Sequence, residues 1–68
     1  MTVTVNGDPL ELAEGATVAD VATVLELPAD ARGVAIAVDR EVVPRGAWAA
    51  TPLREGARVE VVRAVQGG

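Results

Sequence analysis

The segment TVTVNGDPLEL at residues 2–12 decides the fold, because it reads as two strands joined by a tight turn. Its first four residues alternate polar and apolar, which places Val3 and Val5 on one face of a strand. Asn6 and Gly7 then supply the pair of positive φ angles that a two-residue hairpin turn favours. The chain is therefore expected to begin with an antiparallel hairpin that has one apolar face.

The return strand of this hairpin carries Leu10 and Leu12, two residues apart. Pro9 has no amide proton to donate to a neighbouring strand, so it is tolerated where no partner needs one. The return strand is therefore expected at the edge of a sheet.

A helix is predicted directly after the hairpin. Thr17 and Asp20 form the Thr-x-x-Asp pattern that is typical of a helix start. An apolar stripe at helical spacing follows, made of Val18, Val21, Ala22 and Leu25, with Leu27 near its end. Several of these residues are poor helix formers, so packing on the hairpin must supply most of the stability. Pro28 blocks continuation.

The next apolar run, VAIAV, alternates large residues with alanine. Val34, Ile36 and Val38 are expected to meet the helix from one face of a strand. Ala35 and Ala37 would leave the opposite face apolar and low in relief, which suits a platform for a partner. The alternative is that alanine is simply common in this composition.

The second half of the chain gives weaker patterns. We expect a turn at 39–40, a short strand at 41–43, irregular or single-turn helical structure at 45–52, and a last strand at 58–64. Trp48, the only aromatic residue, is interpreted as a core plug rather than a recognition residue. Val59 and Val61 share one face of the last strand.

These elements predict an α+β fold, in which one helix packs on one face of a mixed sheet of four to five strands. A chain of 68 residues has room for one domain. We assign residues 1–64 to the folded domain and residues 65–68 to a flexible C-terminal tail.

The amino-acid composition excludes several classes of function. The chain has no cysteine and no histidine, which removes thiolate and imidazole metal ligands and the commonest nucleophiles and neutral-pH bases. An autonomous enzyme is therefore not expected. A formal net charge of −4 opposes nucleic acid and anionic membrane as partners. No stretch approaches the length of a membrane span, and the start lacks a basic signal-peptide region. A cytoplasmic protein that is monomeric when free is expected.

The last residues carry the functional prediction. A C-terminal carboxyl has a pKa of about 3.5, so near neutral pH it is an anion and a poor electrophile until a partner activates it. The segment Val65-Gln66-Gly67-Gly68, when extended, reaches at most about 14 Å, enough to enter a neighbour's active site. Without a Cβ, the two glycines can pass a narrow channel. The glycines alone would also fit a frayed terminus.

An arm that must be ordered on docking needs a further contact from the folded body to bind well. The candidate docking surface is the alanine platform together with charged residues on or beside the last strand. Its members are Ala35, Ala37, Arg58, Glu60 and Arg63.

The order of these segments resembles the ThiS family of sulfur carrier proteins. The matching segments are VAIAV at 34–38, EVVPR at 41–45 followed by Trp48-Ala49, TPL at 51–53, EG at 55–56, VEVV at 59–62 and AVQGG at 64–68. Val-Pro-Arg-x-x-Trp with the Gly-Gly end is the specific part, since the hairpin and helix would fit any ubiquitin-like protein. Asp39, where the family usually has asparagine, and Ala57, where an acidic residue is common, depart from the pattern.

The resemblance implies a β-grasp fold with the first and last strands side by side in the sheet centre. It also implies that Gly68 is adenylated by an E1-like partner using ATP and magnesium, and then converted to a thiocarboxylate with sulfur from a protein persulfide. Thiazole synthase would take that sulfur for the thiazole of thiamin. The chain itself would bind no cofactor and no metal.

Two alternatives stay open. One is a sulfur carrier of the same fold that serves molybdopterin or cysteine synthesis. The other is a ubiquitin-like module that binds partners or is conjugated to their lysines. Because this chain contains no lysine, it could not form lysine-linked chains with itself.

Overall fold

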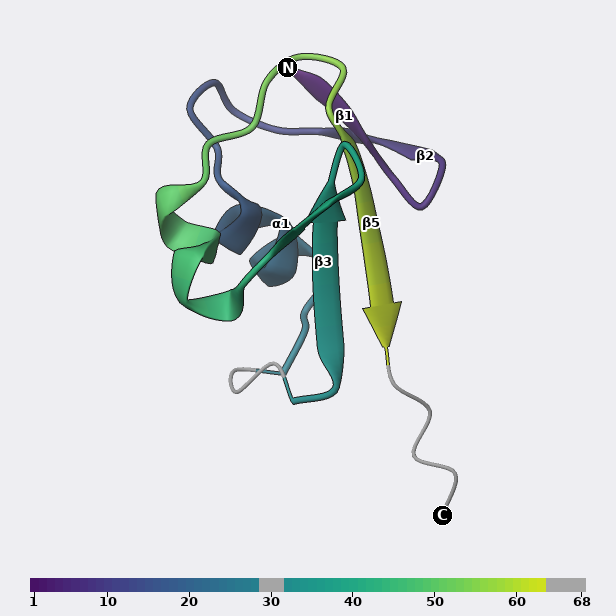
Figure 1. The fold of residues 1–68 in the computed structure, drawn as a ribbon. Coiled ribbons are helices and arrows are strands. Elements are labelled where there is room, and N and C mark those ends of the chain that lie inside the picture. Colours follow the sequence, from purple (N-terminus) through teal and green to yellow (C-terminus); the bar gives the residue numbers. More distant parts are fainter. Residues whose placement is uncertain (29–31, 64–68) are drawn as a thin grey trace.

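The computed structural model describes residues 1–28 and 32–63, and Figure 1 shows their arrangement. The elements are β1 (Thr2–Val5), β2 (Asp8–Glu11), α1 (Val18–Val24), β3 (Val34–Val38), β4 (Glu41–Val43), the 3-10 helix η1 (Arg45–Ala50) and β5 (Arg58–Arg63). Every predicted helix and strand is present, and the irregular stretch after β4 is the 3-10 helix. The predicted last strand extended to Ala64, which lies outside the described residues.

The strands form one mixed sheet in the order β2-β1-β5-β3-β4. The first and last strands, β1 and β5, run parallel side by side, whereas the other pairs are antiparallel. The edge position predicted for the return strand is confirmed: β2 is an outer strand, with Pro9 opposite Thr4. Strand β5 lies in the centre of the sheet and points away from the end of the molecule that carries the N-terminus (Figure 1).

Two turns with positive φ angles set the strand pairing. Asn6 and Gly7 adopt φ values of 51° and 88° between β1 and β2, as the hairpin requires. Asp39 and Arg40, at 49° and 73°, repeat this geometry between β3 and β4. The amide of Asp39 donates to the carbonyl of Arg58 at 2.8 Å, and its Oδ1 accepts from the Arg58 amide at 3.0 Å. An aspartate is therefore compatible with this turn.

Helix α1 begins directly after Thr17, as predicted. Oδ2 of Asp20 accepts hydrogen bonds from the Thr17 amide at 2.7 Å and from its hydroxyl at 3.2 Å. Val18 and Val21 of this helix are completely buried. The helix ends at Val24, before Glu26 adopts a φ of 54°. The seven-residue helix is too short to be stable alone, so its burial against the sheet must hold it in place.

The core lies between α1, η1 and one face of the sheet. Its largest fully buried side chains are Ile36, Val3, Val18, Val21 and Val59. Trp48 is 7% exposed, and its indole N–H donates to the carbonyl of Val43 at 2.9 Å, so the core-plug interpretation is confirmed. No polar side chain in the described part of the chain is buried. The opposite face of the sheet has no helix over it (Figure 1).

Candidate functional site

The C-terminal arm starts from the end of β5. The residues predicted to form the reactive terminus and its tail, Gly68, Gly67, Gln66 and Val65, lie outside the described residues, as does the predicted boundary after Ala64. What the structure describes is the root of the arm at residues 61–63. The geometry of this root and of the surfaces beside it defines the candidate site.

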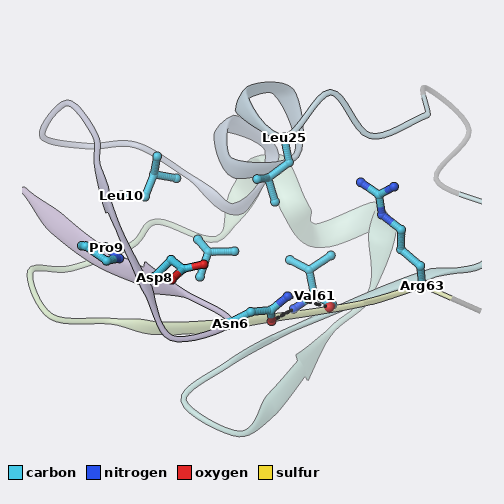
Figure 2. Close-up of a pocket in the computed structure, with 8 residues that line it drawn as sticks. Asn6, Asp8, Pro9, Leu10, Leu25, Val61 and Arg63 are labelled. Atoms are coloured by element: carbon cyan, nitrogen blue, oxygen red, sulfur yellow. Dashed lines mark hydrogen bonds between the residues drawn. The ribbon is translucent and has the colours of Figure 1, made fainter.

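The root of the arm is held from both sides. On one side β3 pairs with β5 as far as Val34 opposite Arg63. On the other side β1 ends at Val5, and the side chain of Asn6 continues the pairing. Its Nδ2 donates to the carbonyl of Val61 at 3.1 Å, and its Oδ1 accepts from the Val61 amide at 2.8 Å (Figure 2).

Sequence reasoning assigned Asn6 to the turn alone. Its partner Val61 is 55 residues away along the chain, so no local pattern signals the contact. Asn6 thus anchors β5 just before the arm begins.

The open face of the sheet carries the predicted alanine platform. Ala37 lies between Val42 and Glu60 in neighbouring strands, and Ala35 lies opposite Val62. Paired residues in antiparallel strands point to the same face, so these side chains form one surface. Val42 and Val62 are 67% and 63% exposed. We call Ala35, Ala37, Val42 and Val62 the open-face patch.

The two valines were missed in the prediction, although strand alternation could have found Val62. Val59 and Val61 face the core. Because successive side chains of a strand point to opposite faces, Val62, which follows Val61, must face away from the core.

The structure divides the predicted docking residues between two faces. Glu60 and Arg58 lie on the open face, opposite Ala37 and Thr4 respectively. Arg63 lies on the other face, because it pairs with Val34, which packs against the core. The prediction that Arg63 shares one surface with the alanines is therefore wrong. Because successive side chains of a strand point to opposite faces of the sheet, residues 60 and 63 cannot lie on the same face. The docking role of the remaining residues stays a prediction.

Arg63 instead lines a groove on the helix side of the sheet. The groove has a volume of about 380 Å³ and lies between β2, the end of α1 and the second half of β5 (Figure 2). Its lining residues are Val5, Asn6, Asp8, Pro9, Leu10, Leu25, Val61 and Arg63. The groove thus adjoins the root of the arm.

The described residues offer little chemistry of their own. Residues 1–28 and 32–63 contain no group of three or more acidic, cysteine or histidine side chains that could hold a metal ion. Among the described helices, none is long and apolar enough to cross a membrane. A hydrogen bond from the Thr2 hydroxyl, together with the charge of the Met1 amine, lowers the pKa of the exposed Glu11 carboxyl.

Solved structures share this arrangement over the whole chain. A crystal structure of the thiamine biosynthesis protein ThiS from Geobacter metallireducens matches with a TM-score of 0.80 and 34% identity, covering 100% of both chains. A solution structure of a thiamine biosynthesis protein from the same organism matches with a TM-score of 0.80 and 31% identity, covering 100% of this chain and 88% of the other. A comparison with curated proteins gives no match.

The central parallel β1–β5 pair, the flanking antiparallel strands and the single covering helix define a β-grasp, ubiquitin-like protein, as predicted. The ThiS family model matches residues 3–68, from the first strand to the last glycine, and the chain therefore belongs to the ThiS family of sulfur carrier proteins.

Proposed function

We propose that this protein carries sulfur for the thiazole moiety of thiamin as a thiocarboxylate on Gly68. The observation that supports this most strongly is the family match, which runs through the terminal glycines and is accompanied by 34% identity to a ThiS protein over its full length. The protein acts as a cosubstrate of its partner enzymes and not as an enzyme.

The chemistry starts from an unreactive carboxylate, because the terminal carboxyl is ionised near neutral pH. An E1-like partner, using ATP and magnesium, joins AMP to the Gly68 carboxylate and releases pyrophosphate. The terminal sulfur of a protein persulfide then attacks the acyl carbon, and AMP leaves. A thiol reduces the remaining sulfur–sulfur bond, which leaves the thiocarboxylate on Gly68. Since the chain has no cysteine or histidine, its partners supply the nucleophile and the base.

Thiazole synthase is the proposed acceptor of this sulfur. The body of the carrier docks on the activating enzyme through the open-face patch, with Arg58 and Glu60 at its border. The arm crosses into the partner's active site, and Gly67 lets it pass closely.

The test is the mass of the intact protein from cells, and again after incubation with ATP, magnesium, an activating enzyme and a persulfide donor. We expect one oxygen to be replaced by one sulfur. Oxidation of Met1, the only methionine, adds nearly the same mass, so the change must be mapped to a C-terminal fragment. A variant that lacks Gly68 is the matched control and should stay unchanged.

Other outcomes separate the alternatives. A terminus joined to a lysine of another protein would indicate conjugation in place of sulfur transfer. A thiocarboxylate that thiazole synthase does not consume would indicate a carrier for molybdopterin or cysteine synthesis. A terminus that remains unmodified under all these conditions would contradict the proposed function.

A further inference from the structure

The groove on the helix side of the sheet has features that the proposed function does not use. Four of its lining side chains are apolar, namely those of Val5, Leu10, Leu25 and Val61. Val5 is buried, whereas the other three remain partly exposed although they pack against the core. The groove therefore presents apolar surface that a further side chain could cover.

Two lining residues of opposite charge, Asp8 and Arg63, flank these apolar side chains. Asp8 pairs in register with Val5 and so points to the helix side from β2, and Arg63 points to the same side from β5. Figure 2 shows them on opposite sides of the groove, with Leu25 above. Neither forms an ion pair or side-chain hydrogen bond with another residue in the described part of the chain. Both charges are free to meet a partner.

The groove is also placed where a partner has to come close. Arg63 is the last described residue of β5, and the arm continues from the next residue. An enzyme that takes the arm into its active site must cover this end of the molecule. The side chain of Asn6 forms hydrogen bonds with the backbone of Val61, which lines the groove and is also the first residue of the root of the arm. The groove and the last residues of β5 are therefore held together by the same contacts.

We propose that the groove is a second docking site for the activating enzyme. The enzyme inserts one apolar side chain into the groove, and an acidic and a basic residue of the enzyme flank this side chain. The apolar side chain covers Leu10, Leu25 and Val61, the partner's carboxylate meets Arg63, and the partner's cation meets Asp8. A volume of about 380 Å³ suits a side chain with its flanking backbone. This inference rests on the proposed function, because it needs a partner that receives the arm.

The test is the rate of ATP-dependent adenylation as a function of carrier concentration, with the activating enzyme used for the mass measurement. Arg63→Glu is expected to raise the KM for the carrier about tenfold with kcat retained, because like charges then face each other. Arg54→Glu is the matched control. It changes the net charge equally, but Arg54 precedes β5 and lies at the opposite end of that strand. It should leave KM nearly unchanged.

The double variant Asp8→Arg with Arg63→Glu separates local fit from overall charge. It keeps the formal net charge of −4 but opposes both proposed contacts, so it should bind more weakly than either single variant. A KM for Arg63→Glu equal to that of Arg54→Glu, or a double variant that binds like the wild type, would overturn the proposal.

Amide shifts of the labelled carrier give an independent readout that needs no variant. On titration with the activating enzyme, the amides of Leu10, Leu25 and Val61 should shift together with those of the open-face patch. Shifts in the open-face patch alone, or groove shifts only with thiazole synthase, would contradict the proposal. If the wild type is not adenylated at all, the proposed function itself fails, and this outcome is distinct from a failure of the groove.

Discussion

Asn6 shows how one residue serves both a turn and a distant strand. Its φ of 51° belongs to the hairpin turn, and its amide group bonds both backbone groups of Val61. The side chain takes the place of the strand residue that would otherwise continue the β1–β5 pairing. Asn6 therefore holds β5 on the side where the β1 pairing ends, while β3 holds the other side as far as Arg63.

Replacing Asn6 separates these two roles. Asn6→Gly keeps the turn but loses both bonds, and should lower the free energy of unfolding by about 1–2 kcal/mol. Asn6→Ala should cost about 1 kcal/mol more, because alanine is disfavoured at positive φ. Urea unfolding measures both. Hydrogen exchange should quicken at the Val61 amide but not at the Thr4 amide, which donates to Ala57. Unchanged exchange at Val61 in Asn6→Gly would contradict this role.

The Thr2–Glu11 pair gives a pH-dependent prediction. The Thr2 hydroxyl donates to Glu11 at 2.6 Å and holds the pKa of that carboxyl below its ordinary value of 4.5. A carboxyl whose pKa is lower in the folded state stabilises the fold above pH 4.5, and this contribution is lost as pH falls through the folded-state pKa. Thr2→Val should therefore raise the Glu11 pKa, as measured by carboxyl NMR titration.

The stability difference between Thr2→Val and the wild type should be largest near neutral pH and should shrink on acidification. Glu11→Gln is the control, since it removes the titrating group and with it this part of the pH dependence. An identical Glu11 pKa in the wild type and Thr2→Val would show that the hydrogen bond is absent in solution.

At the scale of elements, the sheet presents two different faces. One face is covered by α1 and η1 and forms the core with Ile36 and Val59 completely buried. The other carries small and exposed apolar residues, and the exposed fractions of Val42 and Val62 exceed 60%. Exposed valines opposite alanines form a flat apolar surface, which is the form expected of a protein contact.

The open-face patch can be tested with a charge. Val62→Asp should raise the KM for adenylation about tenfold or more, because it places an unpaired carboxylate in the proposed contact. Since Val62 is 63% exposed, the melting temperature should change little. Val24→Asp on α1 is the matched control, because Val24 is 50% exposed but lies on the helix. Equal KM values for the two variants would exclude the patch as a docking surface.

At the scale of the whole molecule, the last strand, which leads into the C-terminal residues, is a central strand of the sheet. The parallel neighbour β1 and the antiparallel neighbour β3 hold β5 from both sides, so β5 ends at Arg63 in the centre of the sheet. A carrier that delivers its terminus to a partner's active site needs a well-defined distance between its docking surface and its reactive end. Because β5 is paired on both sides, its last residue has a fixed position relative to the rest of the sheet.

The length and width of the arm should therefore both matter. Gly67→Val, or one extra glycine after Gly68, should abolish adenylation while the melting temperature stays constant. The extra residue moves the carboxylate by about 3.5 Å, and the valine widens the chain where it must pass closely. Gly46→Val is the control, since a side chain at Gly46 meets open space. Normal adenylation of either arm variant would contradict passage through a narrow channel.

Local patterns in the sequence determined most of the architecture. The alternation in residues 2–5, Asn6-Gly7 and the helical stripe after Thr17 each depend on neighbours within a few positions, so they could be read without the fold. The resemblance to the ThiS family supplied the central pairing of the first and last strands and the role proposed for Gly68, and the family match confirms the membership.

Only the tertiary structure decided which of these residues meet. The bond between Asn6 and Val61 spans 55 positions, and the open-face patch joins residues from β3, β4 and β5. The groove beside Arg63 likewise needs β2, α1 and β5 together. Such contacts depend on strand register and on which face each strand turns to the helix, and these are properties of the packed chain that no short segment contains.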